Sequence, residues 1–288
     1  MEFAALVLSI LPRALPRGSV LAFVGAGGKT SALYALAGEL AAGGARVLVT
    51  TTTMIYDPAR EGGRGLDGVE LLHSLAPGAD RESPSAILSL GSAFDRIGAR
   101  AASGKVLLVA SGALPAEGKL RGIDPDLLES LAPAFDYLLV EADGSRGLPV
   151  KAPGPEEPVM PACADLVLGC VGLDCLGTPI SADTVHRNEA FADIVGAQRG
   201  EAITAAHLVA LATAKDGLFK AAPPSARRLV ALNKADLLSA GSLGSVLDAF
   251  EITFSNGIDL VAACSFTARS DRVIAHRRGT QRLGLPSV

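Results

Sequence analysis

The chain has 288 residues, of which 49% are hydrophobic and 19% charged, a composition typical of a folded protein with a large core rather than of a disordered chain. Its formal net charge of −4 excludes a surface dominated by the basic residues that neutralise nucleic-acid phosphates. We therefore expect one domain over residues 1–288 and no nucleic-acid partner.

An apolar run near the N-terminus, residues 3–11, is too short to span a bilayer. No basic residue precedes this run, so it lacks the pattern of a signal peptide. We expect a cytoplasmic protein without membrane contact. The sequence does not indicate its oligomeric state.

The cysteines lack the C-x-x-C spacing of common metal and redox sites. They are Cys163, Cys170, Cys175 and Cys264. In a reducing compartment we interpret them as small core residues. A soft metal shared by the first three is the alternative.

Short runs rich in Val, Ile and Leu predict strands that are buried on both faces of a sheet. These runs are residues 20–24, 46–49, 106–110, 137–141, 166–171, 229–232 and 260–263. The sequence between these runs predicts helices over residues 29–42, 126–131, 189–195, 204–213 and 237–250. Strands that alternate with helices predict an α/β fold with a doubly wound, mostly parallel sheet, whose ligands bind at the carboxyl ends of the strands.

The segment between Asp57 and Lys105 differs from this alternation of strands and helices, because glycine and proline recur in it. We expect an irregular insertion with one short helix, whose role the sequence does not indicate.

A glycine-rich segment follows the first predicted strand and precedes the first long predicted helix. Its residues, which we expect to surround a nucleotide triphosphate, are Gly25, Ala26, Gly27, Gly28, Lys29, Thr30 and Ser31. Glycines let successive backbone N–H groups face phosphate oxygens, and the start of a helix adds its dipole. Lys29 is then the catalytic cation for the β and γ phosphates, and Thr30 is a ligand of Mg²⁺.

This segment is shorter than the common P-loop motif, because only two residues separate Gly25 from Gly28. The Mur ligases use a shortened GxxGK[ST] loop of this sort. A glycine-rich turn without a ligand is the alternative interpretation.

The second predicted strand ends in the threonines of residues 50–53. Their hydroxyls would lie beside the glycine-rich segment if the two strands share an edge, and we name Thr51 as a candidate Mg²⁺ ligand. The alternative is that threonine is simply a good strand former.

Two acids, Glu141 and Asp143, come at the end of the predicted strand 137–141. An acid at this position can join the Mg²⁺ shell or orient the attacking water, so both are catalytic and metal-binding candidates. Capping of the following turn by Asp143 is the alternative. Arg146 and Lys151 follow closely and could offset phosphate charge.

Two other segments carry candidate functional residues. His186 and Arg187 lie before a predicted helix, where they either face a phosphate or substrate or cap that helix. A basic cluster near the C-terminus is interpreted as a solvated helix face or tail, with a partner surface as the alternative. Its members are Arg269, Arg272, His276, Arg277, Arg278 and Arg282.

The sequence Asn233-Lys234-Ala235-Asp236 follows a predicted strand and matches the NKxD motif of GTP-binding proteins. A carboxylate at Asp236 accepts hydrogen bonds from guanine N1–H and N2–H₂, a donor pair that adenine lacks, and Lys234 packs its stem on the base. This favours GTP over ATP. Asp236 as the cap of the next helix is the alternative.

The order of these motifs along the chain resembles that of the YqeC family. The segments that carry the resemblance are residues 24–30, 49–53, 139–146, 185–189 and 233–236. That family is described as an accessory protein of selenium-dependent molybdenum hydroxylases, so the resemblance implies a role in cofactor maturation with such a hydroxylase as client. The residues to which this resemblance extends are Lys29, Thr30, residues 50–53, Glu141, Asp143, His186 and Arg187.

The sequence therefore predicts a P-loop NTPase-like fold and a Mg²⁺-dependent nucleoside triphosphatase that uses GTP or ATP, with GTP favoured over ATP. One alternative is an ATP-dependent ligase or kinase with a Mur-like short loop. Another is a switch or scaffold that binds nucleotide without hydrolysing it.

Overall fold

The computed structural model describes residues 2–11, 18–56, 69–73, 97–98, 101–114, 116–266 and 273–278. In these ranges nine strands form one central sheet in the order β14-β13-β12-β10-β1-β8-β2-β5-β4. The strands are β1 (Ser19–Gly25), β2 (Arg46–Thr51), β4 (Val69–His73), β5 (Lys105–Ala110), β8 (Tyr137–Glu141), β10 (Leu166–Gly172), β12 (Arg227–Asn233), β13 (Leu260–Cys264) and β14 (Val273–Arg278). All neighbouring pairs are parallel except β13 with β14.

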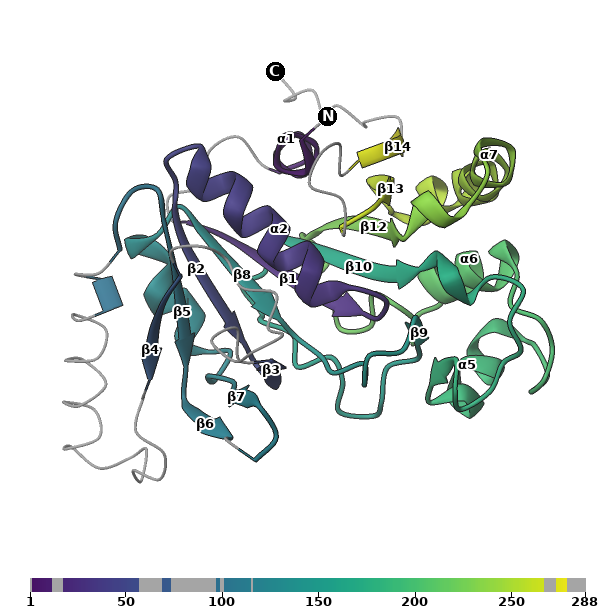
Figure 1. Ribbon diagram of the computed structural model, residues 1–288, viewed down its shortest axis with the longest axis horizontal. Helices are drawn as coiled ribbons and strands as arrows, with labels where there is room; N and C mark the ends of the chain where they lie inside the picture. Colours follow the sequence, from purple (N-terminus) through teal and green to yellow (C-terminus); the bar gives the residue numbers. More distant parts are fainter. Residues whose placement is uncertain are drawn as a thin grey trace, which may run out of the picture.

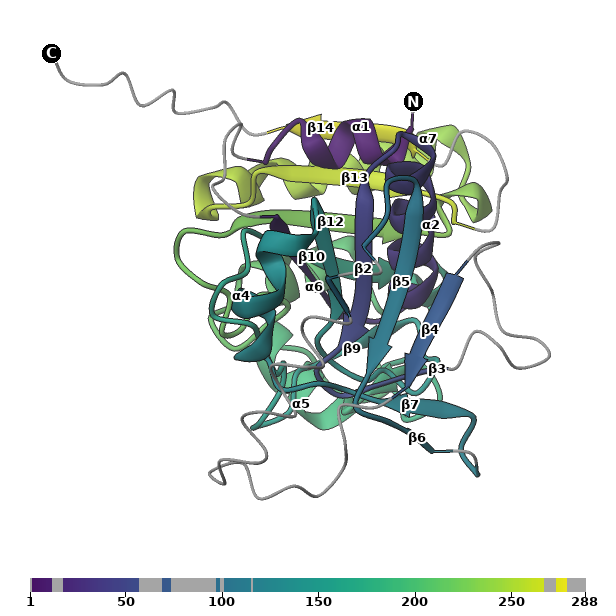
Figure 2. The ribbon, with the colours of Figure 1, turned by 90° about the vertical axis from the view of Figure 1, so that its left-hand side faces the viewer.

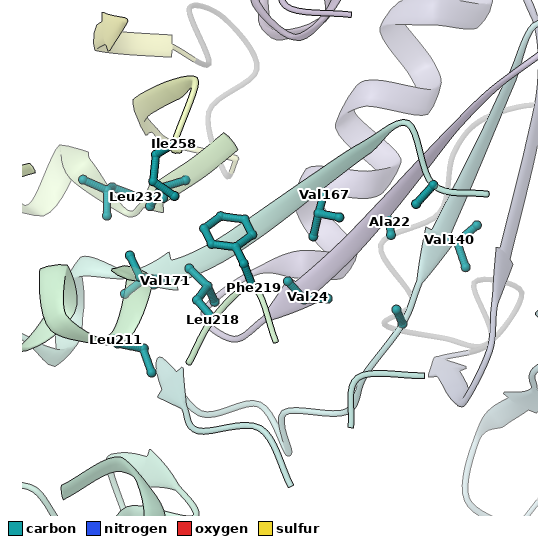
Figure 3. Packing of buried hydrophobic residues seen from close by; sticks show 14 of the residues in the cluster. Ala22, Val24, Val140, Val167, Val171, Leu211, Leu218, Phe219, Leu232 and Ile258 are labelled. Atoms are coloured by element: carbon teal, nitrogen blue, oxygen red, sulfur yellow. The ribbon is translucent and has the colours of Figure 1, made fainter. Parts of the chain in front are cut away.

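The central strands are apolar on both faces because helices cover both faces of the sheet. In β1, residues Val20, Ala22 and Val24 belong to one buried cluster, and Leu21 and Phe23 belong to the other. This alternation is the two-residue period of an extended strand. Figure 3 shows part of the first cluster, where side chains from β1, β8, β10 and β12 meet those of the covering segments.

The helices form two layers (Figure 1). Residues of α1 (Phe3–Leu8) and α2 (Lys29–Ala42) pack in the cluster on one face. Residues of α4 (Leu127–Leu131), α5 (Asn188–Val195), α6 (Ala205–Thr213) and α7 (Ala240–Ala249) pack in the other. Short 3₁₀ helices, η1 (Ala132–Ala134), η2 (Leu173–Cys175), η3 (Ala235–Leu237) and η4 (Phe250–Asn256), connect these elements.

Two small sheets follow the carboxyl ends of the central strands. One is antiparallel and contains β3 (Met54–Tyr56), β7 (Lys119–Arg121) and β6 (Gly112–Leu114), seen at the lower end of β2 and β5 in Figure 2. The other pairs β9 (Val150–Lys151) in parallel with β11 (Val185–His186). Both add structure at the edge where the candidate residues were expected.

The α/β fold class and the seven predicted strands are confirmed. Three local predictions need correction. Residues 69–73, inside the stretch expected to be irregular, form the edge strand β4. The helix expected from residue 237 begins at Ala240, because residues 235–237 form η3.

The third correction concerns the C-terminal basic cluster. His276, Arg277 and Arg278 lie in the strand β14 rather than in a helix or tail. Arg277 contacts Asp248 and Glu251 at 3.4 and 3.6 Å. The other members, Arg269, Arg272 and Arg282, lie outside the described residues, as does most of the segment 57–105.

Within the described ranges, no helix has the length and apolar character needed to cross a bilayer.

Candidate functional site

The glycine-rich loop joins β1 directly to α2. Gly25, Gly27 and Gly28 have φ angles of 90°, 74° and 124°, in the region that side chains with a Cβ atom rarely adopt. A Cβ atom on Gly27 would lie 2.1 Å from the backbone nitrogen of Gly172, and one on Gly28 would lie 2.1 Å from Nδ2 of Asn233. The loop therefore needs glycine both for its conformation and for its close approach to β10 and β12.

The start of α2 is suited to binding an anion. Its N-cap residue is Gly28, which has no side chain to cap the helix. As in any α-helix, the first N–H groups, beginning at Lys29, have no preceding helical carbonyl to bind, and the dipole places partial positive charge there. A strand, a glycine-rich loop and a helix that begins with Lys29-Thr30 follow one another in the order of a P-loop.

Lys29 is buried beside this loop, with 2% of its side chain exposed. Its Nζ donates to the carbonyl of Gly25 at 2.7 Å and lies 3.0 Å from Oδ1 of Asp143. The other oxygen of Asp143 accepts from the N–H of Gly25 at 3.0 Å. Burial by itself would lower the pKa of Lys29, but Asp143 and Glu141 outweigh it and hold that pKa above its ordinary value.

Glu141 contacts the second residue of α2. The hydroxyl of Thr30 donates to Oε2 of Glu141 at 2.8 Å, because β8 lies next to β1 in the sheet and pairs Glu141 with Phe23. Burial raises the pKa of the Glu141 carboxyl, and Lys29 and Thr30 oppose that rise only in part. The structure thus brings together the predicted residues Lys29, Thr30, Glu141 and Asp143.

The threonines at the end of β2 make structural contacts. The hydroxyls of Thr50, Thr51 and Thr52 donate to backbone carbonyls of Val109, Glu141 and Val159, each at 2.7 Å. Thr51, the expected metal ligand, thereby holds β2 to β8. The hydroxyl that contacts the Glu141 carboxylate is that of Thr30.

A line of alternating charges continues from Asp143. Lys151, with 1% of its side chain exposed, places Nζ at 3.0 Å from Oδ2 of Asp143 and 2.5 Å from Oε2 of Glu157. Nη1 of Arg187 lies 2.6 Å from the same Glu157 oxygen. Burial would raise the pKa of Glu157, but the hydrogen bonds from Arg187 and Lys151 lower it to about 2.

The small sheet of β9 and β11 explains how His186 and Arg187 reach this line. It pairs His186 with Lys151, across a separation of 35 residues. Arg187 has a φ of 61°, a left-handed conformation uncommon for arginine. Burial, followed by the charges of Arg187 and Lys151, lowers the pKa of His186.

The Asn233 to Asp236 segment lies at the same edge of the sheet. Nδ2 of Asn233 donates to the carbonyl of Gly27 at 2.7 Å, and its Oδ1 accepts from the N–H of Phe266 at 3.2 Å. Lys234 forms an ion pair with Asp174, which follows β10. Asp236 is exposed to solvent. Asn233 therefore ties the glycine-rich loop to β12 and to the chain after β13.

The cysteines do not form a metal site in the described part of the chain. No group of three or more His, Cys, Asp or Glu side chains there could hold a metal ion. Cys170, Cys175 and Cys264 are buried, and Cys163 is half-buried. Burial raises the pKa of the Cys175 thiol to about 12. These thiols are core residues, as expected.

Comparison with known proteins adds to this geometry. A family model described as "YqeC protein" matches residues 21–189. The Escherichia coli (strain K12) protein named "Uncharacterized protein YqeC" is 36% identical over 233 residues, covering 80% of this chain and 81% of its own length. The chain belongs to the YqeC family.

Among solved structures, the chain has a distant likeness to the crystal structure of FtsY from Mycoplasma mycoides. The TM-score is 0.34 and the sequence identity 16%. The likeness covers 86% of this chain and 61% of the length of that FtsY chain.

The region that matches the YqeC family contains most of the site. It includes the glycine-rich loop, both acids, Lys151, Glu157 and Arg187, and it ends before Asn233. Glu157 is a member of this candidate site that the sequence did not indicate, because it lies in a proline-rich segment without a recognisable motif. The one sequence feature that could have indicated Glu157 is that its carboxylate lies close in sequence to Lys151.

Proposed function

We propose that this YqeC-family protein is a Mg²⁺-dependent nucleoside triphosphatase that favours GTP over ATP. The observation that supports it most is the 2.8 Å contact between the Thr30 hydroxyl and the Glu141 carboxylate at the start of α2. It joins the residue after the P-loop lysine to an acid at the end of the neighbouring strand, the combination that handles metal and phosphate in phosphoryl transfer.

The residues present fit a magnesium ion. Mg²⁺ prefers hard oxygen ligands, and Thr30 and Glu141 supply a hydroxyl and a carboxylate within 2.8 Å of each other. Asp143, two residues further on, is a third candidate ligand, and Thr51 a fourth through its position beside Glu141. When bound, the ion would neutralise charge on the phosphate oxygens.

The protein's own groups then act on the phosphates. The N–H groups of the loop and of the first turn of α2 bind phosphate oxygens, and Lys29 moves from Asp143 to the β and γ phosphates. Water attacks the γ phosphorus, the bond to the bridging oxygen breaks, and nucleoside diphosphate and phosphate leave. Glu141 and Asp143 are the acids that orient water and metal in this proposal.

Guanine preference rests on the Asn233 to Asp236 segment. The 2.7 Å bond from Asn233 to Gly27 puts this segment beside the phosphate loop. Asp236 is exposed and has two acceptor oxygens for the N1–H and N2–H₂ groups of guanine.

For the cellular role, we propose an accessory factor in maturation of a selenium-dependent molybdenum hydroxylase or its cofactor. Hydrolysis would accompany transfer of a cofactor component to that client. The support is the YqeC-family membership of the chain and the likeness of its motif order, not the site geometry.

A comparison of Mg²⁺-GTP and Mg²⁺-ATP tests the enzymatic part. Binding is measured by calorimetry and phosphate release by a colorimetric assay, with and without a molybdenum hydroxylase. Tighter binding and faster release with GTP are expected. Binding without release would instead indicate a switch, and a preference for ATP would favour a ligase or kinase.

Replacing Lys29 by alanine tests the phosphate loop. Lys29→Ala is expected to lower triphosphate affinity by at least about a hundredfold, because a buried cation at the phosphates is lost. The matched control is Lys105→Ala, an exposed lysine at the start of β5, at the opposite end of the strands. Unchanged affinity in Lys29→Ala would refute the assignment of the loop.

Replacing Asp236 by asparagine tests base recognition. Asp236→Asn is expected to weaken GTP binding by roughly tenfold or more and to shift preference toward xanthosine triphosphate. The reason is that an amide can donate to the oxygen that xanthine carries in place of the N2–H₂ group of guanine. Competition binding with the three nucleotides measures this. Equal effects on GTP and ATP would contradict the guanine assignment.

A further inference from the structure

Lys151 is a buried cation that the proposed phosphate chemistry does not use. Its Nζ contacts Asp143 at 3.0 Å, Glu157 at 2.5 Å and the carbonyl of Gly144 at 2.7 Å. With 1% of the side chain exposed, these groups replace the water that an ammonium normally binds. Such burial of a lysine is rare unless it is paired.

Asp143 is held from two sides. Lys29 and Lys151 each lie 3.0 Å from it, on different carboxylate oxygens, and the N–H of Gly25 adds a hydrogen bond at 3.0 Å. Its side chain is only 2% exposed. A negatively charged carboxylate that is buried in this way is energetically costly unless a cation compensates its charge.

Nucleotide binding disturbs this balance. In the proposed function Lys29 turns to the phosphates, so Asp143 loses one of its two cations. Without Lys151, no cation of the protein would then compensate this buried carboxylate beside an incoming triphosphate. The contact with Lys151 is on the other oxygen and need not break.

We propose that Lys151 is a positioning residue for the triphosphatase, an inference that rests on the proposed function. It keeps its ammonium on Asp143 when Lys29 leaves, so that Lys29 is released to the phosphates while Asp143 keeps its place against Gly25. Glu157, which Arg187 also holds at 2.6 Å, fixes Lys151 in that position. Lys151 therefore acts through Asp143 and touches no substrate.

The first test replaces the ammonium by an apolar group of similar length. Lys151→Met is expected to weaken Mg²⁺-GTP binding by about tenfold to a hundredfold in calorimetry, because Lys29 must then either stay on Asp143 or leave it uncompensated. Lys151→Arg keeps the charge and is expected to recover part of the loss. The matched control is Lys220→Met. In the wild type, Nζ of Lys220 donates to the carbonyls of Gly154 and Pro155, on the segment that also carries Glu157.

A double-mutant cycle separates this role from general destabilisation. In an Asp143→Asn background there is no carboxylate to compensate, so adding Lys151→Met is expected to change GTP affinity by less than about threefold. A merely structural lysine would cause the same loss in both backgrounds. Equal losses, or wild-type affinity in Lys151→Met, would overturn the proposal.

The wild-type protein provides a test that needs no variant. In a crystal structure with a non-hydrolysable GTP analogue and Mg²⁺, Lys29 is expected on the phosphates and Lys151 still on Asp143. Lys151 displaced from Asp143, or Lys29 retained on it, would overturn the proposal even if Lys151→Met did not fold. A wild type that binds no triphosphate would refute the proposed function itself, whereas nucleotide binding with a displaced Lys151 refutes only this inference.

Discussion

At the scale of single residues, each of the carboxylates Asp143 and Glu157 in the site contacts two cationic side chains. Glu157 receives both Lys151 and Arg187 on one oxygen, which lowers its pKa to about 2. A carboxyl whose pKa is lower in the folded than in the unfolded chain stabilises the fold above its ordinary pKa, and that contribution disappears as the pH falls toward the folded value. The Glu157 charge should thus contribute to stability at neutral pH.

Glu157→Gln tests this. It is expected to lower the free energy of unfolding by about 2 kcal/mol near neutral pH, because two charged hydrogen-bond partners lose their anion. The difference from wild type should shrink as the pH falls from the ordinary pKa of 4.5 toward 2. Urea unfolding at a series of pH values measures it.

The control for this prediction is the same substitution in an exposed pair. Glu189 contacts Arg199 at 2.8 Å with 75% of its side chain exposed, so Glu189→Gln should hardly change stability. A Glu157→Gln protein that showed no more pH dependence than this control would contradict the role given to Glu157.

At the scale of elements, one asparagine joins three of them. Asn233 at the end of β12 bonds to the loop after β1 and to the chain after β13. Asn233→Ala is expected to cost about 1 to 3 kcal/mol of stability, since it leaves two buried backbone groups without a partner. It should also weaken triphosphate binding, because the loop loses its anchor at Gly27.

Thermal unfolding and calorimetry measure these two effects of Asn233→Ala. The control is Asn256→Ala. Asn256 is exposed, and its Nδ2 donates to the carbonyl of Ile252 at 3.1 Å. Loss of stability without loss of binding would mean that the loop keeps its shape without Asn233.

The sequence predicted the elements well where the signal was local. A strand, a glycine-rich loop and a helix that follow one another from residue 19 to 42 reveal their structure by composition alone. The edge strand β4 was missed because glycine and proline surround residues 69–73. The sequence did not predict the hydrogen bonds from the hydroxyls of Thr50, Thr51 and Thr52 to backbone carbonyls of neighbouring segments.

At the scale of the whole molecule, the contacts that complete the site join distant parts of the chain. Asn233 and Gly27 are 206 residues apart, and Arg187 and Glu157 are 30 apart. No local pattern encodes such pairs, because they depend on the strand order of the sheet. The sequence therefore indicated Asp143, Lys151 and Arg187 as separate candidates. It did not predict that Glu157 joins Lys151 to Arg187.

The antiparallel strand β14 has a consequence for the surface of this protein. Among the described residues it is the last strand on one side of the nine-stranded sheet. It carries His276, Arg277 and Arg278, and Arg277 contacts Asp248 and Glu251. An exposed sheet edge invites pairing with another polypeptide, and charged side chains discourage it. Two copies that joined here would have to bring like charges together, so aggregation by strand addition at this edge is disfavoured.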